Sequence, residues 1–155
     1  MIDHPSDYHE LHARSAFSFL RGASAPETLA DRAGECGLPG VAVCDRDGFY
    51  GSVRFHQRAR ENGFRALVGT ELTMTDGSVL PVLIKTRAAY RTVSRLLTRA
   101  QLRSAKGNCS LEWSELTEVA DDIAVLSGDG EGPLERGWRE DGRRGMEAAL
   151  QTLLR

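Results

Sequence analysis

The sequence predicts an α/β fold in which a largely parallel sheet is flanked by helices. Short apolar runs alternate with stretches of helical periodicity along the 155 residues, an order typical of repeated strand–helix units. The run 40–44 is apolar throughout and lies between Gly and Asp, as expected for a strand buried on both faces. The pair Asp76-Gly77 between two apolar runs predicts a two-residue hairpin after the third strand.

The elements follow in order along the chain. The predicted strands, including the two arms of the hairpin, cover residues 8–13, 40–44, 66–68, 71–75, 78–84 and 123–126. The predicted helices cover about 24–36, 51–62, 87–103 and 142–155, with a short one around Trp113 and Leu116. The helix 87–103 is amphipathic, with arginines on its outer face. A closed (β/α) barrel needs more strands, so the sheet is either open or part of a barrel.

Capping residues set the helix boundaries. Ser24 and Glu27 have the spacing of a capping box, and Pro26 fits the first turn, so a helix is expected to begin there. Gly37 and Gly63 follow the last periodic positions of the first two helices and are the expected stops.

Composition bounds the function classes. Hydrophobic residues make up 41% and charged residues 27%, which predicts one globular domain over 8–155 after a flexible N-terminus at 1–7. No apolar run reaches the roughly 20 residues of a membrane span, and 1–10 carries acids rather than a signal sequence. Three unpaired cysteines indicate reduced thiols and a cytoplasmic protein. A net charge of −2 argues against a free-standing nucleic-acid binder.

Polar side chains follow three of the predicted strands directly. They lie in the stretches 10–15, 44–48 and 69–71. Functional residues of α/β proteins gather at the carboxyl ends of parallel strands, so these stretches predict one shared polar site. Taken singly, an Asp after a strand is more often a turn or cap residue than a ligand.

These same stretches resemble the motifs of a known family. Residues 10–15 and 17–24 are similar to the opening of the PHP (polymerase and histidinol phosphatase) domain, in the version that heads error-prone, DNA polymerase III alpha-like (C-family) bacterial polymerases. Residues 42–51, 68–72 and 126–129 resemble later motifs in matching order and spacing. The resemblance implies a partial (β/α)7 barrel, which in active members holds a cluster of metal ions.

Only part of the family's ligand set is present. His12 matches the first His of the His-x-His pair, while Asp45 and Glu71 match an Asp and a bridging Glu. The final Asp-x-His motif would lie beyond Arg155, so the domain is expected to be incomplete at its C-terminus.

The other ligand positions carry residues of different chemistry: Arg14, Arg21, Arg46, Val79 and Asp129. A guanidinium offers only hydrogen-bond donors and a permanent positive charge, so it cannot ligate a cation. The resemblance therefore predicts a vestigial site with no metal and no cofactor. Any residual Zn, Mn or Mg would be held by His12, Asp45 and Glu71. The arginines are expected either to pair with the carboxylates or to bind a phosphate.

The leading interpretation is a non-catalytic structural or interaction domain of an error-prone polymerase that acts in DNA replication and translesion synthesis. Its expected partners are the palm and thumb domains in cis or in trans, with DNA bound by the parent polymerase rather than by this domain. The chain lacks the palm, so alone it is expected to be inactive. One alternative is a metal-dependent phosphoesterase or 3′–5′ exonuclease. A second is a stand-alone remnant that self-associates through exposed sheet edges.

Overall fold

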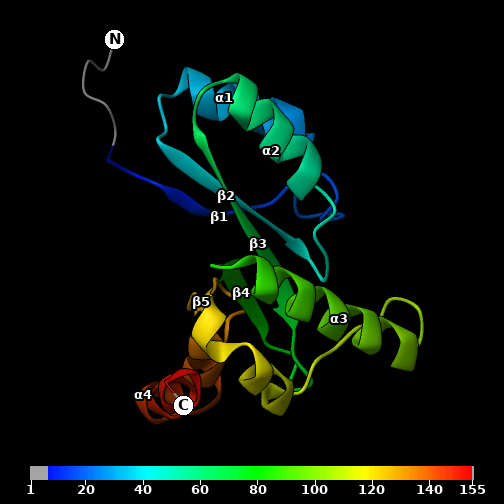
Figure 1. Ribbon diagram of the computed structural model, residues 1–155. Coiled ribbons are helices and arrows are strands. Elements are labelled where there is room, and N and C mark those ends of the chain that lie inside the picture. The colour runs from blue at the N-terminus through cyan, green and yellow to red at the C-terminus, as the bar shows by residue number, and fades with distance from the viewer. Residues whose placement is uncertain (1–6, 155) are drawn as a thin grey trace. The chain divides into compact units, whose positions relative to one another are not determined.

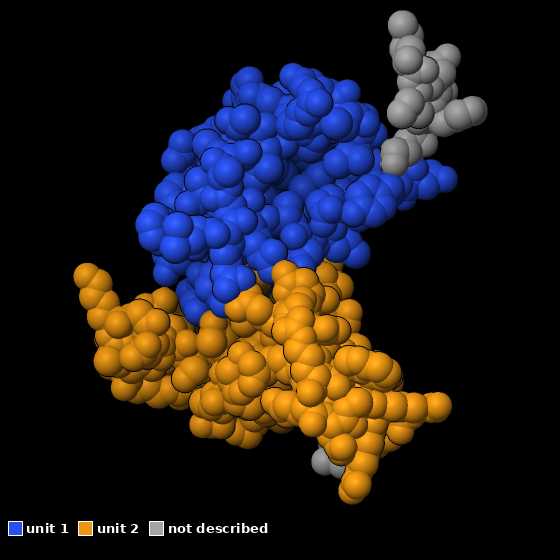
Figure 2. Space-filling view, turned by 180° about the vertical axis from the view of Figure 1, so that it is seen from behind, with its two compact units in different colours: residues 1–70 blue, residues 71–155 orange. Residues whose placement is uncertain are grey.

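The computed structural model describes residues 7–154, which fall into two compact units divided between Thr70 and Glu71 (Figure 2). The expected flexible N-terminus lies almost wholly outside the described residues. None of the described helices is both long and apolar enough to cross a bilayer.

The fold is α/β, with a five-stranded mixed and open sheet (Figure 1). The strands lie in the order β1-β2-β3-β4-β5, and their bounds are Glu10–Ala13 for β1, Gly40–Arg46 for β2, Arg65–Thr73 for β3, Val79–Ile84 for β4 and Ile123–Val125 for β5. β1 and β2 pair in parallel, whereas β4 and β5 are antiparallel. The prediction of a largely parallel sheet is therefore only partly right. An apolar run carries no sign of its direction, and β5 adds to the outer arm of the hairpin.

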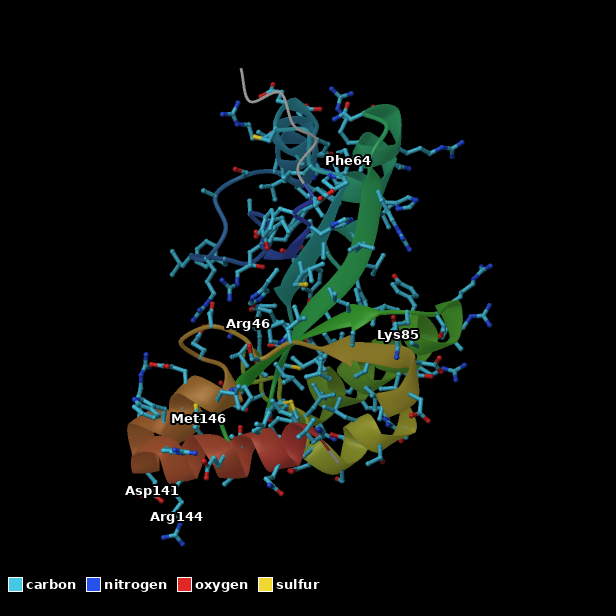
Figure 3. The ribbon with its side chains drawn as sticks, turned by 90° about the vertical axis from the view of Figure 1, so that its left-hand side faces the viewer. Arg46, Phe64, Lys85, Asp141, Arg144 and Met146 are labelled. Atoms are coloured by element: carbon cyan, nitrogen blue, oxygen red, sulfur yellow. The ribbon has the colours of Figure 1, made fainter. Side chains whose placement is uncertain are left out.

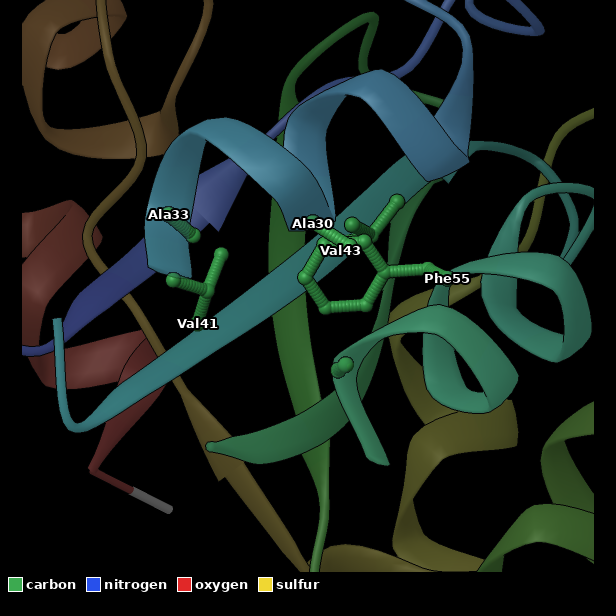
Figure 4. Packing of buried hydrophobic residues seen from close by; sticks show 6 residues of the cluster. Ala30, Ala33, Val41, Val43 and Phe55 are labelled. Atoms are coloured by element: carbon green, nitrogen blue, oxygen red, sulfur yellow. The ribbon is translucent and has the colours of Figure 1, made fainter. Parts of the chain in front are cut away.

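Two helices pack side by side in the first unit, α1 (Pro26–Glu35) and α2 (Ser52–Glu61). The core of this unit is built from Ala30, Val43 and Phe55, each at most 1% exposed (Figure 4). The ring of Phe55 meets that of Phe64 edge to face, with 5.9 Å between centroids. All but the last residue of β2 are buried, which confirms the prediction of a strand covered on both faces.

The C-terminal ends of these two helices lie where the glycines of the sequence predict them, but the predicted capping box at the beginning of α1 is absent. Gly37 and Gly63 take φ values of 67° and 78° just after α1 and α2, as predicted. The prediction of a capping box at Ser24 was wrong, because Ala25 is the N-cap of α1 and no side chain caps this helix. The carbonyl of Ser24 instead accepts a hydrogen bond from the amide of Ala16 at 2.8 Å, which closes a loop.

In the second unit, the hairpin between β3 and β4 is confirmed, but its turn has three residues rather than two. The amide of Met74 donates to the carbonyl of Ser78 at 2.9 Å, and that of Gly77 donates to Met74 at 2.9 Å. Only Gly77 has a positive φ, of 80°, as in a turn that ends in a left-handed residue. Asp76 closes the turn by accepting from the amide and the hydroxyl of Ser78 at 2.8 and 2.6 Å.

The helix α3 (Arg87–Arg103) has the predicted bounds, and the hydroxyl of its N-cap Thr86 accepts from the amide of Ala89 at 3.0 Å. Two 3₁₀ helices follow, η1 (Trp113–Glu118) and η2 (Ala120–Asp122). The buried side chains of α3 are Ala89, Val93, Leu96, Leu97 and Ala100. Their spacing is that of one helical face, as the periodicity of the sequence predicts.

The last helix, α4 (Pro133–Leu153), is longer than predicted and reverses on itself. Gly142, with φ of 56° and ψ of −139°, breaks it into two segments. Asp141 and Arg144 flank this reversal (Figure 3), and their charged groups are 3.8 Å apart. The two segments touch at Gly137 and Gly145, where an added Cβ on Gly145 would lie 2.1 Å from the carbonyl oxygen of Gly137.

Candidate functional site

The carboxyl ends of β1 and β2 lie at one edge of the first unit. The two strands run in parallel, with Ala13 opposite Val43. His12 therefore lies near the end of β1 and Arg14 just after it, beside Asp45 and Arg46 at the end of β2. Within residues 1–70, the structure brings these four predicted positions to neighbouring strand ends.

Asp45 is the centre of this edge. Asp45 is only 1% exposed, and its carboxylate accepts five hydrogen-bond contacts of 2.7–2.9 Å. Oδ1 accepts from the amide and hydroxyl of Ser15 and from the hydroxyl of Ser18. Oδ2 accepts from the hydroxyl of Ser15 and from the amide of Gly51. Two oxygens offer about four lone-pair positions, so this carboxylate is saturated.

These hydrogen bonds join three segments of the first unit. Ser15 and Ser18 belong to the loop after β1, Asp45 belongs to β2, and Gly51 is the N-cap of α2. A carboxylate is favourable next to the amides that begin a helix, since those amides carry a partial positive charge. Among the described residues, the donors to this carboxylate are two serine hydroxyls and two backbone amides, and none is an arginine.

Thr70 ties the turn after β2 to β3. Its hydroxyl lies 3.0 Å from the carbonyl oxygen of Asp45 and 3.1 Å from that of Gly48, and it accepts from the amide of Gly48 at 3.2 Å. Within this turn Asp47 adopts a left-handed φ of 52°, which Asp tolerates better than most residues. The hydroxyl of Thr70 thus holds the main chain at Asp45, before the turn, and at Gly48, within it.

Two glycines allow the close packing around Asp45. A Cβ on Gly51 would lie 2.6 Å from Oδ2 of Asp45 and 2.9 Å from the hydroxyl of Ser15. A Cβ on Gly22 would lie 2.0 Å from the carbonyl oxygen of Ser15. Any side chain at either position would push apart the loop and the strand.

The loop 15–22 presents apolar side chains to solvent. Its amides at Ser18, Arg21 and Gly22 donate to Ser15 and Ser18, so the loop is a series of turns. Phe19 and Leu20 at its tip are 83% and 89% exposed. Leu20 also has a φ of 62°, which costs a residue with a branched side chain about 1–2 kcal/mol.

The other predicted positions lie on separate elements. Arg21 is exposed in the loop after β1. In the second unit, Glu71 is buried in β3, and Val79 is buried as the first residue of β4. Asp129 is exposed, and its Oδ1 accepts from the amide of Glu131 at 3.1 Å, so it helps to form the loop after β5.

The residues at the strand ends do not fit a metal cluster. A divalent ion needs several oxygen or nitrogen lone pairs at about 2.0–2.3 Å. Both oxygens of Asp45 already face hydrogen-bond donors, and Val79 offers no donor atom. Between residues 7 and 154, no group of three or more His, Cys, Asp or Glu side chains is placed to hold an ion.

A separate cavity of about 380 Å³ lies in the second unit, beside the turn at Asp76. The indole nitrogen of Trp113 donates to Oδ2 of Asp76 at 2.9 Å, and Arg136 donates to its carbonyl at 2.9 Å. Burial raises the pKa of Asp76, but the hydrogen bonds from Ser78 and Trp113 and the charge of Arg136 together lower it below its usual value. The polar groups around this cavity thus bind one another.

The stretches that resemble family motifs contain Ser15, Ser18, Gly51 and Thr70, but none of these residues was predicted to have a role in the site. Their signals are present, since a Ser-x-x-Ser spacing follows β1 and a glycine begins the helix after Asp45. Serine, glycine and threonine are common in loops, however, and only the coordinates show that all four converge on one strand end.

Comparison with known proteins identifies the polymerases to which the chain is similar. The "Error-prone DNA polymerase" of Rhodopirellula baltica is 42% identical over 116 residues, which cover 75% of this chain and 10% of that protein. That of Mycobacterium tuberculosis is 36% identical over 159 residues, covering 95% of this chain and 14% of that protein. The chain thus spans only about a tenth to a seventh of these polymerases and matches their N-terminal region.

Solved structures support the fold. A protein from Bifidobacterium adolescentis assigned as a metal-dependent phosphoesterase aligns with a TM-score of 0.52 and 25% identity, over 64% of this chain and 35% of that one. An amidohydrolase from Chromobacterium violaceum aligns with a TM-score of 0.52 and 23% identity, over 61% and 33%. The family profile of the PHP domain matches residues 10–155. With nearly its whole length matched, the chain belongs to the PHP domain family.

Proposed function

We propose that the chain is a non-catalytic PHP-type domain that serves as a structural and interaction module of an error-prone DNA polymerase, in replication and damage-tolerant synthesis. In this proposal it forms part of a (β/α)7 barrel that has kept its strand ends as a scaffold. The relatives support the polymerase context, since the chain corresponds to a small N-terminal part of them. Their other domains, including the palm and the thumb, are the proposed partners.

The saturated carboxylate of Asp45 is the observation that carries the non-catalytic part. A metal ligand needs free lone pairs, whereas this carboxylate accepts from Ser15, Ser18 and Gly51. Arginine at positions 14, 21 and 46 adds positive charge where the family's active members place ligands. The strand end that would bind an ion therefore holds a loop and a helix instead.

The apolar tip of the loop 15–22 supports the interaction part. Large apolar side chains that gather at a surface commonly mark a protein contact. Phe19 and Leu20 are exposed there, and the loop that carries them is fastened to Asp45 through Ser18. We propose that this tip packs against another domain of the polymerase.

Metal analysis and hydrolysis assays test the non-catalytic part. The purified chain should retain under about a tenth of an equivalent of Zn, Mn or Mg, and a chelator should leave its Tm unchanged. It should release no product from bis(p-nitrophenyl) phosphate or from a 3′-labelled oligonucleotide when these metals are added. About one equivalent of metal, with hydrolysis that Asp45→Asn abolishes, would establish the phosphoesterase instead. The resemblance to the Bifidobacterium adolescentis protein makes that the second candidate.

A chimera tests the interaction part. This chain would replace the matching region of the Mycobacterium tuberculosis polymerase, to which it is 36% identical. We expect primer extension to survive in the chimera and to fall when Phe19 and Leu20 are both changed to Ser. The matched control is Leu102→Ser on α3, an equally exposed leucine at 83%. Equal effects of the two changes would remove the loop tip as the contact.

A further inference from the structure

The helix α3 carries a stripe of arginines and no acidic residue. Five arginines recur at every fourth position along it: Arg87, Arg91, Arg95, Arg99 and Arg103. All five are exposed. Arg99 and Arg103 pair with Glu118 and Glu115 of η1, at 3.1 and 2.6 Å. Within the described part of the chain, the side chains of Arg87, Arg91 and Arg95 have no hydrogen-bond or ion-pair partner.

The arginines of α4 show the arrangement that an ordinary solvated helix adopts. Each of them lies within 4.0 Å of an acid three or four residues away on the same helix, in the pairs Arg136–Glu140, Arg139–Glu135, Arg143–Glu147 and Arg144–Asp141. Such pairs stabilise a helix, whereas like charges four residues apart destabilise it by a similar amount. The stripe on α3 therefore has an electrostatic cost that α4 avoids.

The position of the stripe adds to this cost. Arg87 is the first residue of α3, whose first turn holds no acid. The beginning of a helix carries a partial positive charge, so a cation there is unfavourable. The arginines of α3 thus oppose helix stability in two ways, through their mutual repulsion and through the cation at the beginning of the helix. A negatively charged partner bound to this surface would offset both costs.

We propose that Arg87, Arg91 and Arg95 form a contact surface for the phosphate backbone of a nucleic acid. Four residues of helix rise about 6 Å and turn about 40° past a full circle, so the three arginines lie along one side over about 12 Å. One strand of duplex DNA carries a phosphate every 3.4 Å or so along its axis, or about three to four phosphates in that length. Arginine is well suited to bind phosphate oxygens in pairs.

The surface adds to DNA binding by other domains and does not replace it. The chain's net charge of −2 opposes the approach of a polyanion, so binding by the chain alone is weak. Three phosphate contacts predict a slope of log affinity against log salt of about −2 for a single strand and about −3 for a duplex. This inference rests on α3 alone and is independent of the proposed role of Asp45.

Fluorescence anisotropy with a labelled single strand and a labelled duplex of about 20 nucleotides tests the proposal, at about 20 to 200 mM NaCl. The whole chain with Arg87, Arg91 and Arg95 changed to Gln should bind at least about tenfold more weakly at low salt, with a nearly flat salt dependence. Its Tm should be unchanged or higher, because like-charge repulsion is removed. The matched control changes Arg139, Arg143 and Arg144 to Gln, which removes the same charge from α4 and should weaken binding less than about twofold.

Three outcomes overturn the proposal. They are no binding of DNA by the unchanged chain at the lowest salt, equal losses in the two triple variants, and displacement of the DNA by poly-glutamate as readily as by unlabelled DNA. The last outcome would point to an acidic polypeptide as the partner, whereas poly-glutamate that displaces no DNA supports the proposal. A triple Lys variant covers the case in which the Gln variant fails to fold, since it keeps the charge. It should retain binding within about threefold, and binding lost with its fold intact counts against phosphate contacts.

Discussion

Arg103 and Glu115 form a two-point ion pair that closes the loop between α3 and η1. Nη1 of Arg103 donates to Oε1 of Glu115 at 2.8 Å, and Nη2 donates to Oε2 at 2.6 Å. Nη2 also donates to the carbonyl of Ser110 at 2.7 Å, and Oε2 accepts from the amide of Glu112 at 2.9 Å. One ion pair thus fastens the end of a helix, a loop and the beginning of η1.

The Arg103–Glu115 pair predicts a specific loss of stability in acid. The hydrogen bonds from Arg103 hold the pKa of Glu115 at about 2, below its ordinary 4.5. Because the folded-state pKa is lowered, the stabilisation is complete above about pH 4.5 and is lost as the pH falls toward 2. Since Arg103 is partly exposed, we expect Glu115→Gln to cost about 1 kcal/mol or less at neutral pH. Urea unfolding of both proteins between these pH values should show the difference vanish, and a constant difference would contradict the linkage.

Asp45 should be among the residues whose change is most damaging in the first unit. In Asp45→Asn the amide NH₂ would face donors from Ser15, Ser18 or Gly51, so a buried donor would meet another donor. We expect a loss of about 2–4 kcal/mol in the free energy of unfolding, against about 1–2 kcal/mol for Ser18→Ala. Asp47→Asn is the matched control, because it removes the same charge two residues away and Asn adopts a left-handed φ readily. Equal losses in the two Asn variants would show that charge, rather than the hydrogen bonds, matters.

Leu20→Gly should stabilise the chain although it removes an apolar side chain. Leu20 is 89% exposed and has a φ of 62°, so Gly relieves backbone strain and loses almost no burial. After the greater chain entropy of Gly is subtracted, we expect a gain of about 0.5 kcal/mol. Phe19→Gly serves as the comparison, since Phe19 has no positive φ and the change should lower stability by about 0.5–1 kcal/mol. Thermal unfolding that ranks the two variants the other way would refute the strain.

Gly145→Ala should separate the two segments of α4. The new Cβ would lie 2.1 Å from the carbonyl oxygen of Gly137, which is far inside van der Waals contact with main-chain atoms. We expect a local loss of about 1–3 kcal/mol, seen as faster hydrogen exchange over residues 143–153. Gly130→Ala is the control, because its Cβ would meet only the end of the Arg139 side chain at 3.4 Å. Unchanged exchange in Gly145→Ala would mean that the segments are not in contact in solution.

Local chemistry made much of the fold predictable. The bounds of α3 and the ends of α1 and α2 follow from periodicity and from Gly37 and Gly63, which act within a few residues of themselves. The first segment of α4 was missed because Gly137 within it and Gly142 at its end weaken the helical pattern. Gly137 and Gly145 serve the contact between the two segments and Gly142 makes the reversal, which are tertiary properties.

The neighbourhood of Asp45 and the residues after β1 was predictable, but the hydrogen-bond partners of Asp45 were not. Parallel strands place Asp45 beside the residues that follow β1, as expected from the order of apolar and polar residues. Which donors reach its carboxylate depends on the path of the loop 15–22, and a sequence pattern does not encode that path. Serine hydroxyls at 2.7–2.9 Å therefore donate to the carboxylate of Asp45, for which the sequence predicted arginine as one possible partner.

The reversal in α4 bears on how the chain folds during synthesis. Among the residues of α4, Pro133 alone is buried, so this helix contributes little to the core. A ribosome synthesises all five strands, and α3 with its buried face, before it begins α4. The sheet and α3 therefore need little from the helical hairpin, which is the last of the described elements to be made.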